Sequence, residues 1–163
     1  MSKHHRNRNW APAPQPLPED AHVIDNHTHV ASVVPFSQAM SHEAMEKGQG
    51  EVPVYSVDEL LEQAQKVGVE GVIDCGCELP NLMTAIDMAR EHPGTVHAAI
   101  AIHPNEAVLH GHRGAPGPDG LPIKYKPWHD IPFDEAMAEV HRLATTYPNQ
   151  VVAIGETGMD LFR

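Results

Sequence analysis

Short apolar runs recur along the chain and predict strands. Val23 and Ile24 lead into a polar motif, and three further runs follow at 69–75, 96–102 and 151–154. Apolar runs of about four to eight residues, bounded by glycine and proline, are typical of strands that are covered on both faces. We therefore predict four strands, of which the first lies at 22–25.

Three of the segments between these strands have the spacing of an amphipathic helix. Ser56 and Glu59 form a capping-box pattern, after which apolar residues recur every three or four positions until Gly68. A second helix is predicted to begin at Pro80, because proline suits the first turn, and a third at 133–146. The third helix is predicted to bury Phe133, Met137, Val140, Leu143 and Ala144.

Two long connections, 31–55 and 106–132, lack this periodicity, and we predict loops there. Loops of such length inside a compact domain are uncommon unless they serve a function. The chain has 15 prolines and 12 glycines, which also favours long loops. The histidines of the second loop are expected at solvated positions; they are His110, His112 and His129.

The order of these elements predicts the fold class. Strands that alternate with helices, with short returns from helix to strand, indicate an α/β fold with a parallel sheet. A candidate functional group follows each strand, as in a (β/α) barrel, whose chemistry gathers at the carboxyl ends of its strands. A closed barrel needs eight strands. We therefore predict the first half of a (β/α)8 TIM-type barrel at 22–163, with three intervening helices and truncated after the fourth strand, preceded by a flexible proline-rich tail at 1–21.

Composition narrows the class of partner. The net charge of −11 argues against a broad electrostatic grip on nucleic acid or on an anionic membrane, although a phosphate held by metal ions at one point remains compatible with it. No apolar run approaches the ~18 residues of a membrane span, and the start of the chain lacks the apolar core of a signal peptide. Two cysteines are too few and too close for a disulfide framework, so we expect a cytoplasmic protein.

A His-x-His pair at the end of the first strand is the leading candidate for chemistry. If the strand continues to His29, then His27 and His29 share a face, with Cα atoms roughly 7 Å apart. Both imidazoles can then reach one ion at about 2.0–2.1 Å. Glu156 follows the fourth strand between Gly155 and Gly158, which leave room for a closely packed site. Two histidines and a carboxylate suit a divalent cation.

Five other residues are weaker candidates. Asp25 is interpreted as a supporting or turn-forming acid rather than a direct ligand, and Asp160 either orders the Glu156 loop or is solvated. His103 leaves the third strand and either contacts substrate phosphate or is a satisfied histidine at the rim. Cys75 and Cys77 resemble a metal pair by residue type, but small buried residues are the favoured interpretation because C-x-C without further cysteines is a weak signal.

Three motifs carry a family resemblance: DNHTH at 25–29, AIHPNE at 101–106 and IGETGMD at 154–160. In order and spacing, 23–163 resembles the TatD family of metal-dependent deoxyribonucleases. The resemblance implies an amidohydrolase-like TIM barrel with a two-metal centre that hydrolyses DNA phosphodiesters. It implies that His27 and His29 are ligands of one metal, that Glu156 bridges two metals, and that His103 lies close to substrate. The insertion after His110 is longer than the family pattern.

The leading hypothesis is therefore a TatD-like metal-dependent hydrolase of DNA phosphodiesters, with Glu156 and His103 as catalytic residues. The resemblance implies two divalent ions in the complete enzyme, and the sequence does not distinguish Mg, Mn and Zn. Family members draw two more histidines and an aspartate from later strands, so we expect this chain to be an inactive N-terminal fragment. The expected partner is DNA or another phosphoester, with no membrane and no protein partner. The alternatives are another amidohydrolase-type barrel acting on amide or phosphotriester bonds, where a lysine would be expected in place of Glu156, and a fragment without turnover.

Overall fold

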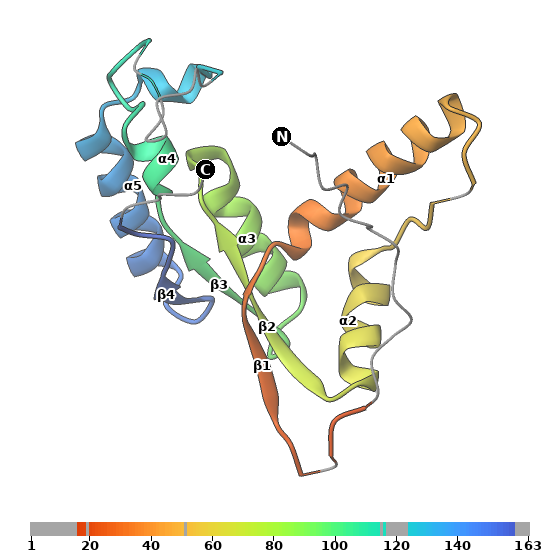
Figure 1. Cartoon of the computed structure of the whole chain (residues 1–163). Helices are drawn as coiled ribbons and strands as arrows, with labels where there is room; N and C mark the ends of the chain where they lie inside the picture. Colours follow the sequence, from red (N-terminus) through yellow and green to blue (C-terminus); the bar gives the residue numbers. More distant parts are fainter. Residues whose placement is uncertain (1–15, 19, 51, 115, 117–123, 159–163) are drawn as a thin grey trace.

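A sheet of four parallel strands organises the molecule (Figure 1). The computed structural model describes residues 16–18, 20–50, 52–114, 116 and 124–158. The strands are paired in the order in which they occur, β1 to β4. They are β1 (Val23–Thr28), β2 (Val69–Gly76), β3 (Val96–Ile100) and β4 (Val151–Ile154). The α/β class and the four parallel strands predicted from the sequence are therefore confirmed.

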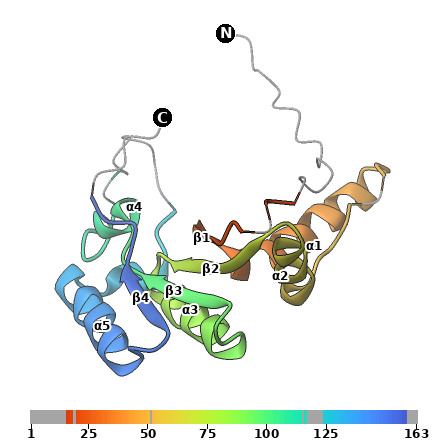
Figure 2. The same ribbon diagram turned by 90° about the horizontal axis from the view of Figure 1, so that it is seen from below.

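Three helices follow the sequence prediction and lie at the outside of the curved sheet (Figure 2). They are α2 (Val57–Lys66), α3 (Leu79–Glu91) and α5 (Phe133–Thr146). The capping box of α2 is present, because Ser56 Oγ accepts the N–H of Glu59 and the Glu59 carboxylate accepts the N–H of Ser56 at 2.8 Å. Gly68 follows the helix with φ +96°, a conformation that a side chain would strain.

The core lies between the sheet and these helices. Alternate residues of β3 point toward the helices, and α3 and α5 present their apolar faces to them. Because these side chains are nearly inaccessible to water, they contribute most of the apolar burial. The most completely buried members of this cluster are Leu82, Ala85, Ile86, Val96, Ala98, Ile100, Ala136, Val140 and Leu143. In α5 the prediction for Phe133 was wrong: its side chain is 40% exposed, because it stands at the open first turn of the helix.

The prediction of a loop at 31–55 was wrong over most of its length. Helix α1 (Val30–Glu46) occupies it. No side chain of the segment caps the helix, Pro35 lies inside it, and Phe36 and Met45 are exposed, so the local signals for a helix are weak. The N–H of Ala31 in its first turn instead donates to the carboxylate of Asp74, which lies in the distant strand β2. A helix stabilised in this way cannot be recognised from its own sequence.

The second predicted loop also contains ordered structure. Helix α4 (Pro104–Ala107) overlaps its start, and the 3-10 helix η1 (Pro127–Asp130) lies within it. The expectation of solvated histidines was wrong for His110 and His129, whose exposures are 1% and 0%, and holds for His112, which is exposed. The aromatic rings of the segment pack on His129 and remove it from water.

Part of the predicted tail and one candidate residue lie outside the described residues. These are 1–15 with residue 19, and Asp160. Leu17, within the predicted tail, donates its N–H to the carbonyl of Val67 at 2.9 Å. The domain boundary at 21/22 stays a prediction. Within the described ranges, no helix is long and apolar enough to cross a lipid bilayer.

Candidate metal centre

The carboxyl end of β1 brings two imidazoles to one place. Asp25 Oδ1 accepts the N–H of His27 at 3.1 Å, and the pairing of β1 with β2 is irregular between Asp25 and Thr28. This short-range bond, at the irregular part of the strand, agrees with the interpretation of Asp25 as a supporting or turn-forming acid. The rings of His27 and His29 lie edge to face, with centroids 5.3 Å apart. The two side chains therefore project to the same side, as the His-x-His spacing predicts.

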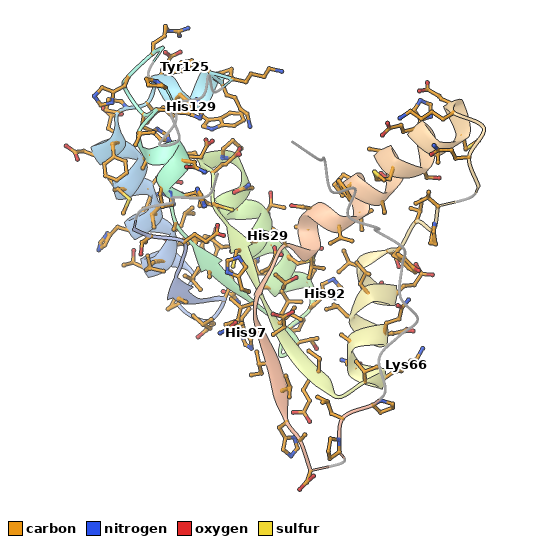
Figure 3. The ribbon with its side chains drawn as sticks, in the orientation of Figure 1. His29, Lys66, His92, His97, Tyr125 and His129 are labelled. Carbon is orange, nitrogen blue, oxygen red and sulfur yellow. The ribbon has the colours of Figure 1, made fainter. Side chains whose placement is uncertain are left out.

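A backbone carbonyl orients the second imidazole. His29 Nδ1 lies 3.1 Å from the carbonyl oxygen of Cys75 in β2, so Nδ1 carries the proton and donates it to that oxygen. The lone pair is consequently on Nε2, which lies 3.8 Å from Glu156 Oε1. Histidine ligands commonly have their tautomer and ring orientation fixed by such a bond from the other nitrogen. Figure 3 shows His29 at the point where β1 runs into α1.

Glu156, two residues beyond β4, closes the group. Its Oε1 lies 3.1 Å from His27 Nε2, and its side chain is only 15% exposed. Its other oxygen, Oε2, is buried and has no hydrogen-bond partner. The residue has φ +51°, in the left-handed region that non-glycine residues seldom occupy. A strained backbone and an unsatisfied buried carboxylate oxygen together are typical of a residue held in place for function.

The donor set fits a divalent ion. One ligand atom from each of His27, His29 and Glu156 lies within 4.8 Å of the other two, and the described residues contain no second such group of three. Two donors that bind one ion at about 2.1 Å are separated by roughly 3–4 Å, so small side-chain adjustments suffice. An ion would also supply the missing partner of Glu156 Oε2.

The two cysteines lie next to this group without belonging to it. Both are free thiols, and Cys75 is buried. Burial, and the negative charge of Glu156, raise the pKa of the Cys75 and Cys77 thiols above their ordinary value. Neither sulfur belongs to the group of three donor atoms described above. The geometry agrees with the interpretation of both as small buried or half-buried residues.

His103 is not a member of the donor group. It follows β3, and its N–H binds the carbonyl of Cys77 at 2.9 Å, which fixes it at the same edge of the sheet. Its Nδ1 accepts the N–H of Asn105 at 3.1 Å and so caps α4. Its predicted contact with substrate stays a prediction.

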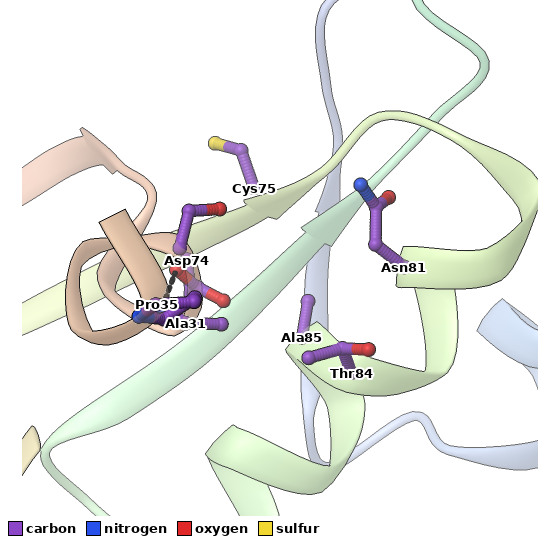
Figure 4. Close-up of a pocket in the computed structure, with 8 residues that line it drawn as sticks. Ala31, Pro35, Asp74, Cys75, Asn81, Thr84 and Ala85 are labelled. Carbon is purple, nitrogen blue, oxygen red and sulfur yellow. Dashed lines mark hydrogen bonds between the residues drawn. The ribbon is translucent and has the colours of Figure 1, made fainter. Parts of the chain in front are cut away.

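Sequence reasoning missed Asp74, which supports the His29 region. Its side chain is 1% exposed and its Oδ1 accepts the N–H of Ala31 at 3.4 Å, so it caps the helix that begins directly after His29 (Figure 4). Burial raises the pKa of the Asp74 carboxyl above its usual range. Asp74 and Asn81 also line a pocket of about 240 Å³ between α1, β2 and α3. An acid between Ile73 and Cys75, within the buried part of β2, was the signal that could have identified it.

Comparison with known proteins bears on the same region. The family model described as TatD related DNase matches residues 24–163. This match includes every residue of the candidate centre. No curated protein matches the chain at a significant level.

Proposed function

Because the chain belongs to the TatD-related DNase family, whose members are metal-dependent hydrolases with a TIM-barrel fold, we propose that its metal centre serves hydrolysis of DNA phosphodiesters. We assign His27 and His29 as ligands of one ion. We assign Glu156 as a ligand that bridges to a second ion in the complete site. The observation that carries this assignment is the buried Oε2 of Glu156, which has no partner while Oε1 faces both imidazoles.

The residues of the chain have separate tasks in this proposal. Divalent ions, whether Mg, Mn or Zn, would supply an activated water nucleophile and neutralise charge on the phosphate. The Cys75 carbonyl keeps the lone pair of His29 on Nε2. His103, fixed at the same edge, is assigned to contact the substrate phosphate. Glu156 suits a bridge, because each of its two carboxylate oxygens could bind one ion and paired ions lie roughly 3.5–4 Å apart.

We further propose that the four strands are one half of a (β/α)8 barrel. Among the described residues, the outer strands β1 and β4 each pair on one side only, and Ile24 and Ile154 on them are 58% and 53% exposed. Additional strands would cover these edges and bring further ligands. Three donors can hold one ion, but a two-ion clamp needs more. The 163-residue chain alone is therefore proposed to bind one ion without turning over DNA.

Metal binding tests the ligand assignment without relying on activity. Equilibrium dialysis of residues 1–163 against zinc or manganese, followed by elemental analysis, should find one ion per chain. His27→Ala and Glu156→Ala should lose it. His42→Ala is the matched control, because this exposed histidine of α1 pairs only with Glu46 among the contacts observed. Retention of the ion by both site variants would refute the assignment.

A phosphodiester probe tests the substrate class. Manganese bound at the centre should broaden the ³¹P resonance of the dinucleotide d(TpT) in the presence of the chain, and the effect should vanish in His27→Ala. Broadening that is equal for both proteins would contradict phosphodiester binding at this centre. In a parallel assay, the chain should not cleave single-stranded DNA; cleavage abolished by His27→Ala would overturn the inactivity of the half-barrel while supporting the reaction.

A further inference from the structure

Most Lys and Arg side chains of the described residues form ion pairs with acids on or next to their own helices. Four cations lie on, or directly after, the helices α1, α2, α3 and α5, and each pairs with an acid three or four positions away. They are Lys47, Lys66, Arg90 and Arg142. The remaining three lie in the connection between β3 and α5, together with two aromatic rings. We call this group the basic aromatic segment; its members are Arg113, Lys124, Tyr125, Lys126 and Trp128.

Cations and rings are interleaved in this segment. The Arg113 guanidinium carbon lies 4.6 Å from the centroid of the Tyr125 ring, and Lys126 Nζ lies 4.7 Å from that of Trp128. Lys124 is exposed between them in sequence. The result is two adjoining units in which a positive charge stands over a planar ring. Among the described residues, the other Lys and Arg side chains are the four that pair with acids on or next to their own helices.

Partly buried hydrogen bonds hold the segment in shape. His129 Nδ1 accepts the N–H of Lys126 at 3.1 Å, so its Nε2 carries the proton and donates it to Glu106 Oε2 at 2.6 Å. Trp128 Nε1 donates to the same oxygen at 3.2 Å. Glu106 belongs to α4 and thus fastens Trp128 and His129 to the helix that follows His103. Preorganisation of this kind reduces the entropy lost when a ligand binds.

The segment stands at the metal-bearing edge of the sheet. Figure 1 shows α4 and η1 beyond the carboxyl ends of the strands, on the side where β1 runs into α1. Figure 3 shows Tyr125 and His129 in this position. Lys126 Nζ lies 3.4 Å from both carboxylate oxygens of Glu78. Glu78 directly follows Cys77, whose carbonyl accepts the N–H of His103 at this edge.

We propose that the basic aromatic segment binds a single nucleic-acid strand beside the metal centre, with phosphates against its cations and a base against Trp128 or Tyr125. The inference rests on the proposed function and specifies where the strand lies. The Arg113–Asp130 pair is largely exposed on both sides, at 70% and 58%, and exposed pairs contribute little stability, so a phosphate can replace the aspartate. Arginine binds phosphate in a bidentate geometry, and aromatic side chains stack on any base.

Salt dependence of binding tests the cations. The anisotropy of fluorescein-labelled dT12 is titrated with the 163-residue chain in EDTA at several salt concentrations, so that neither metal nor cleavage contributes. Each phosphate contact to a single strand contributes a slope of about −0.7 to log K against log salt. Arg113→Ala and Lys126→Ala should each reduce the steepness by about 0.7. Arg142→Ala, which removes an exposed cation that pairs with Glu139 within α5, should leave it unchanged.

Stacking is tested separately. Trp128→Leu should weaken dT12 binding about tenfold, whereas Trp128→Phe, which keeps a ring and loses the bond to Glu106, should restore most of it. Thermal melts establish that each variant is folded. Failure of the wild-type chain to bind dT12, equal slopes for Lys126→Ala and Arg142→Ala, or equal affinity for an abasic strand of the same length would each overturn the proposal.

The two proposals fail in different ways. Variant-sensitive dT12 binding without phosphorus broadening of d(TpT) would refute the proposed reaction and leave the strand-binding segment in place. Broadening of the d(TpT) resonance, without an effect of the segment variants on dT12 binding, would refute the strand-binding segment and leave the proposed reaction in place.

Discussion

Replacing Asp74 tests whether a residue outside the donor group organises the metal-binding end of β1. Its carboxylate accepts the N–H of Ala31, and His29, the residue at the helix start, makes no side-chain cap. Loss of an N-cap acceptor costs about 1 kcal/mol, and the backbone N–H left without a partner adds to this. Asp74→Ala should therefore be about 1 kcal/mol less stable than Asp74→Asn, which keeps an acceptor. For a chain of this size the difference corresponds to about 2–4 °C in Tm.

The charge of Asp74 gives a second, pH-dependent effect. Burial raises its pKa in the folded chain, so the folded state holds the proton more tightly than the unfolded state does. The stability from this proton is present below the ordinary pKa and is lost as the pH rises through the raised one. Relative to wild type, Asp74→Asn should therefore gain stability between acid and neutral pH, where the wild-type carboxyl ionises.

The assay is thermal or urea unfolding of the three proteins in EDTA between pH 4 and 7.5, followed by zinc titration at pH 7. Asp74→Ala should bind zinc more weakly than Asp74→Asn, because α1 begins directly after His29. Equal melting of the two variants at every pH, or a difference between wild type and Asp74→Asn that does not change with pH, would refute this reasoning.

Three further substitutions test the packing that positions the site. Gly76→Ala should lower Tm and zinc affinity together in a thermal melt and titration, because its Cβ would lie 2.8 Å from the Asn81 carbonyl oxygen; unchanged values would show that α3 can shift freely. Glu106→Ala should open the segment around His129 to hydrogen exchange while β3 stays protected, since the buried His129 and the half-buried Trp128 lose their acceptor; unaltered exchange would contradict this. Leu82→Ala, at a fully buried position, should reduce the free energy of unfolding by about 2–5 kcal/mol in urea, and a loss below 1 kcal/mol would contradict the assigned core.

The sequence predicted those elements that are determined locally. The capping box at Ser56 and Glu59, the apolar spacing of α5 and the short apolar strands are local patterns, and each element appears where it was expected. The convergence of His27, His29 and Glu156 could be predicted because strand alternation and parallel strand order place all three at one edge.

Features that depend on distant partners were missed for a physical reason. Helix α1 is capped by Asp74, which lies 43 positions further along the chain, and the proline inside the helix argues against it. His129 is buried because rings from its own segment and the carboxylate of Glu106 surround it, although the local sequence is rich in polar residues. Such burial is a tertiary effect that neither periodicity nor composition indicates.

X-ray absorption spectroscopy of the zinc-loaded chain tests the metal centre most directly. The spectrum should show nitrogen and oxygen donors at about 2.0–2.1 Å, with the multiple scattering of two imidazoles. His27→Ala should show one imidazole fewer, and Glu156→Gln should weaken zinc binding while leaving both. Sulfur scattering at about 2.3 Å, which would place Cys75 or Cys77 on the ion, or a spectrum unaffected by loss of His27, would contradict the account.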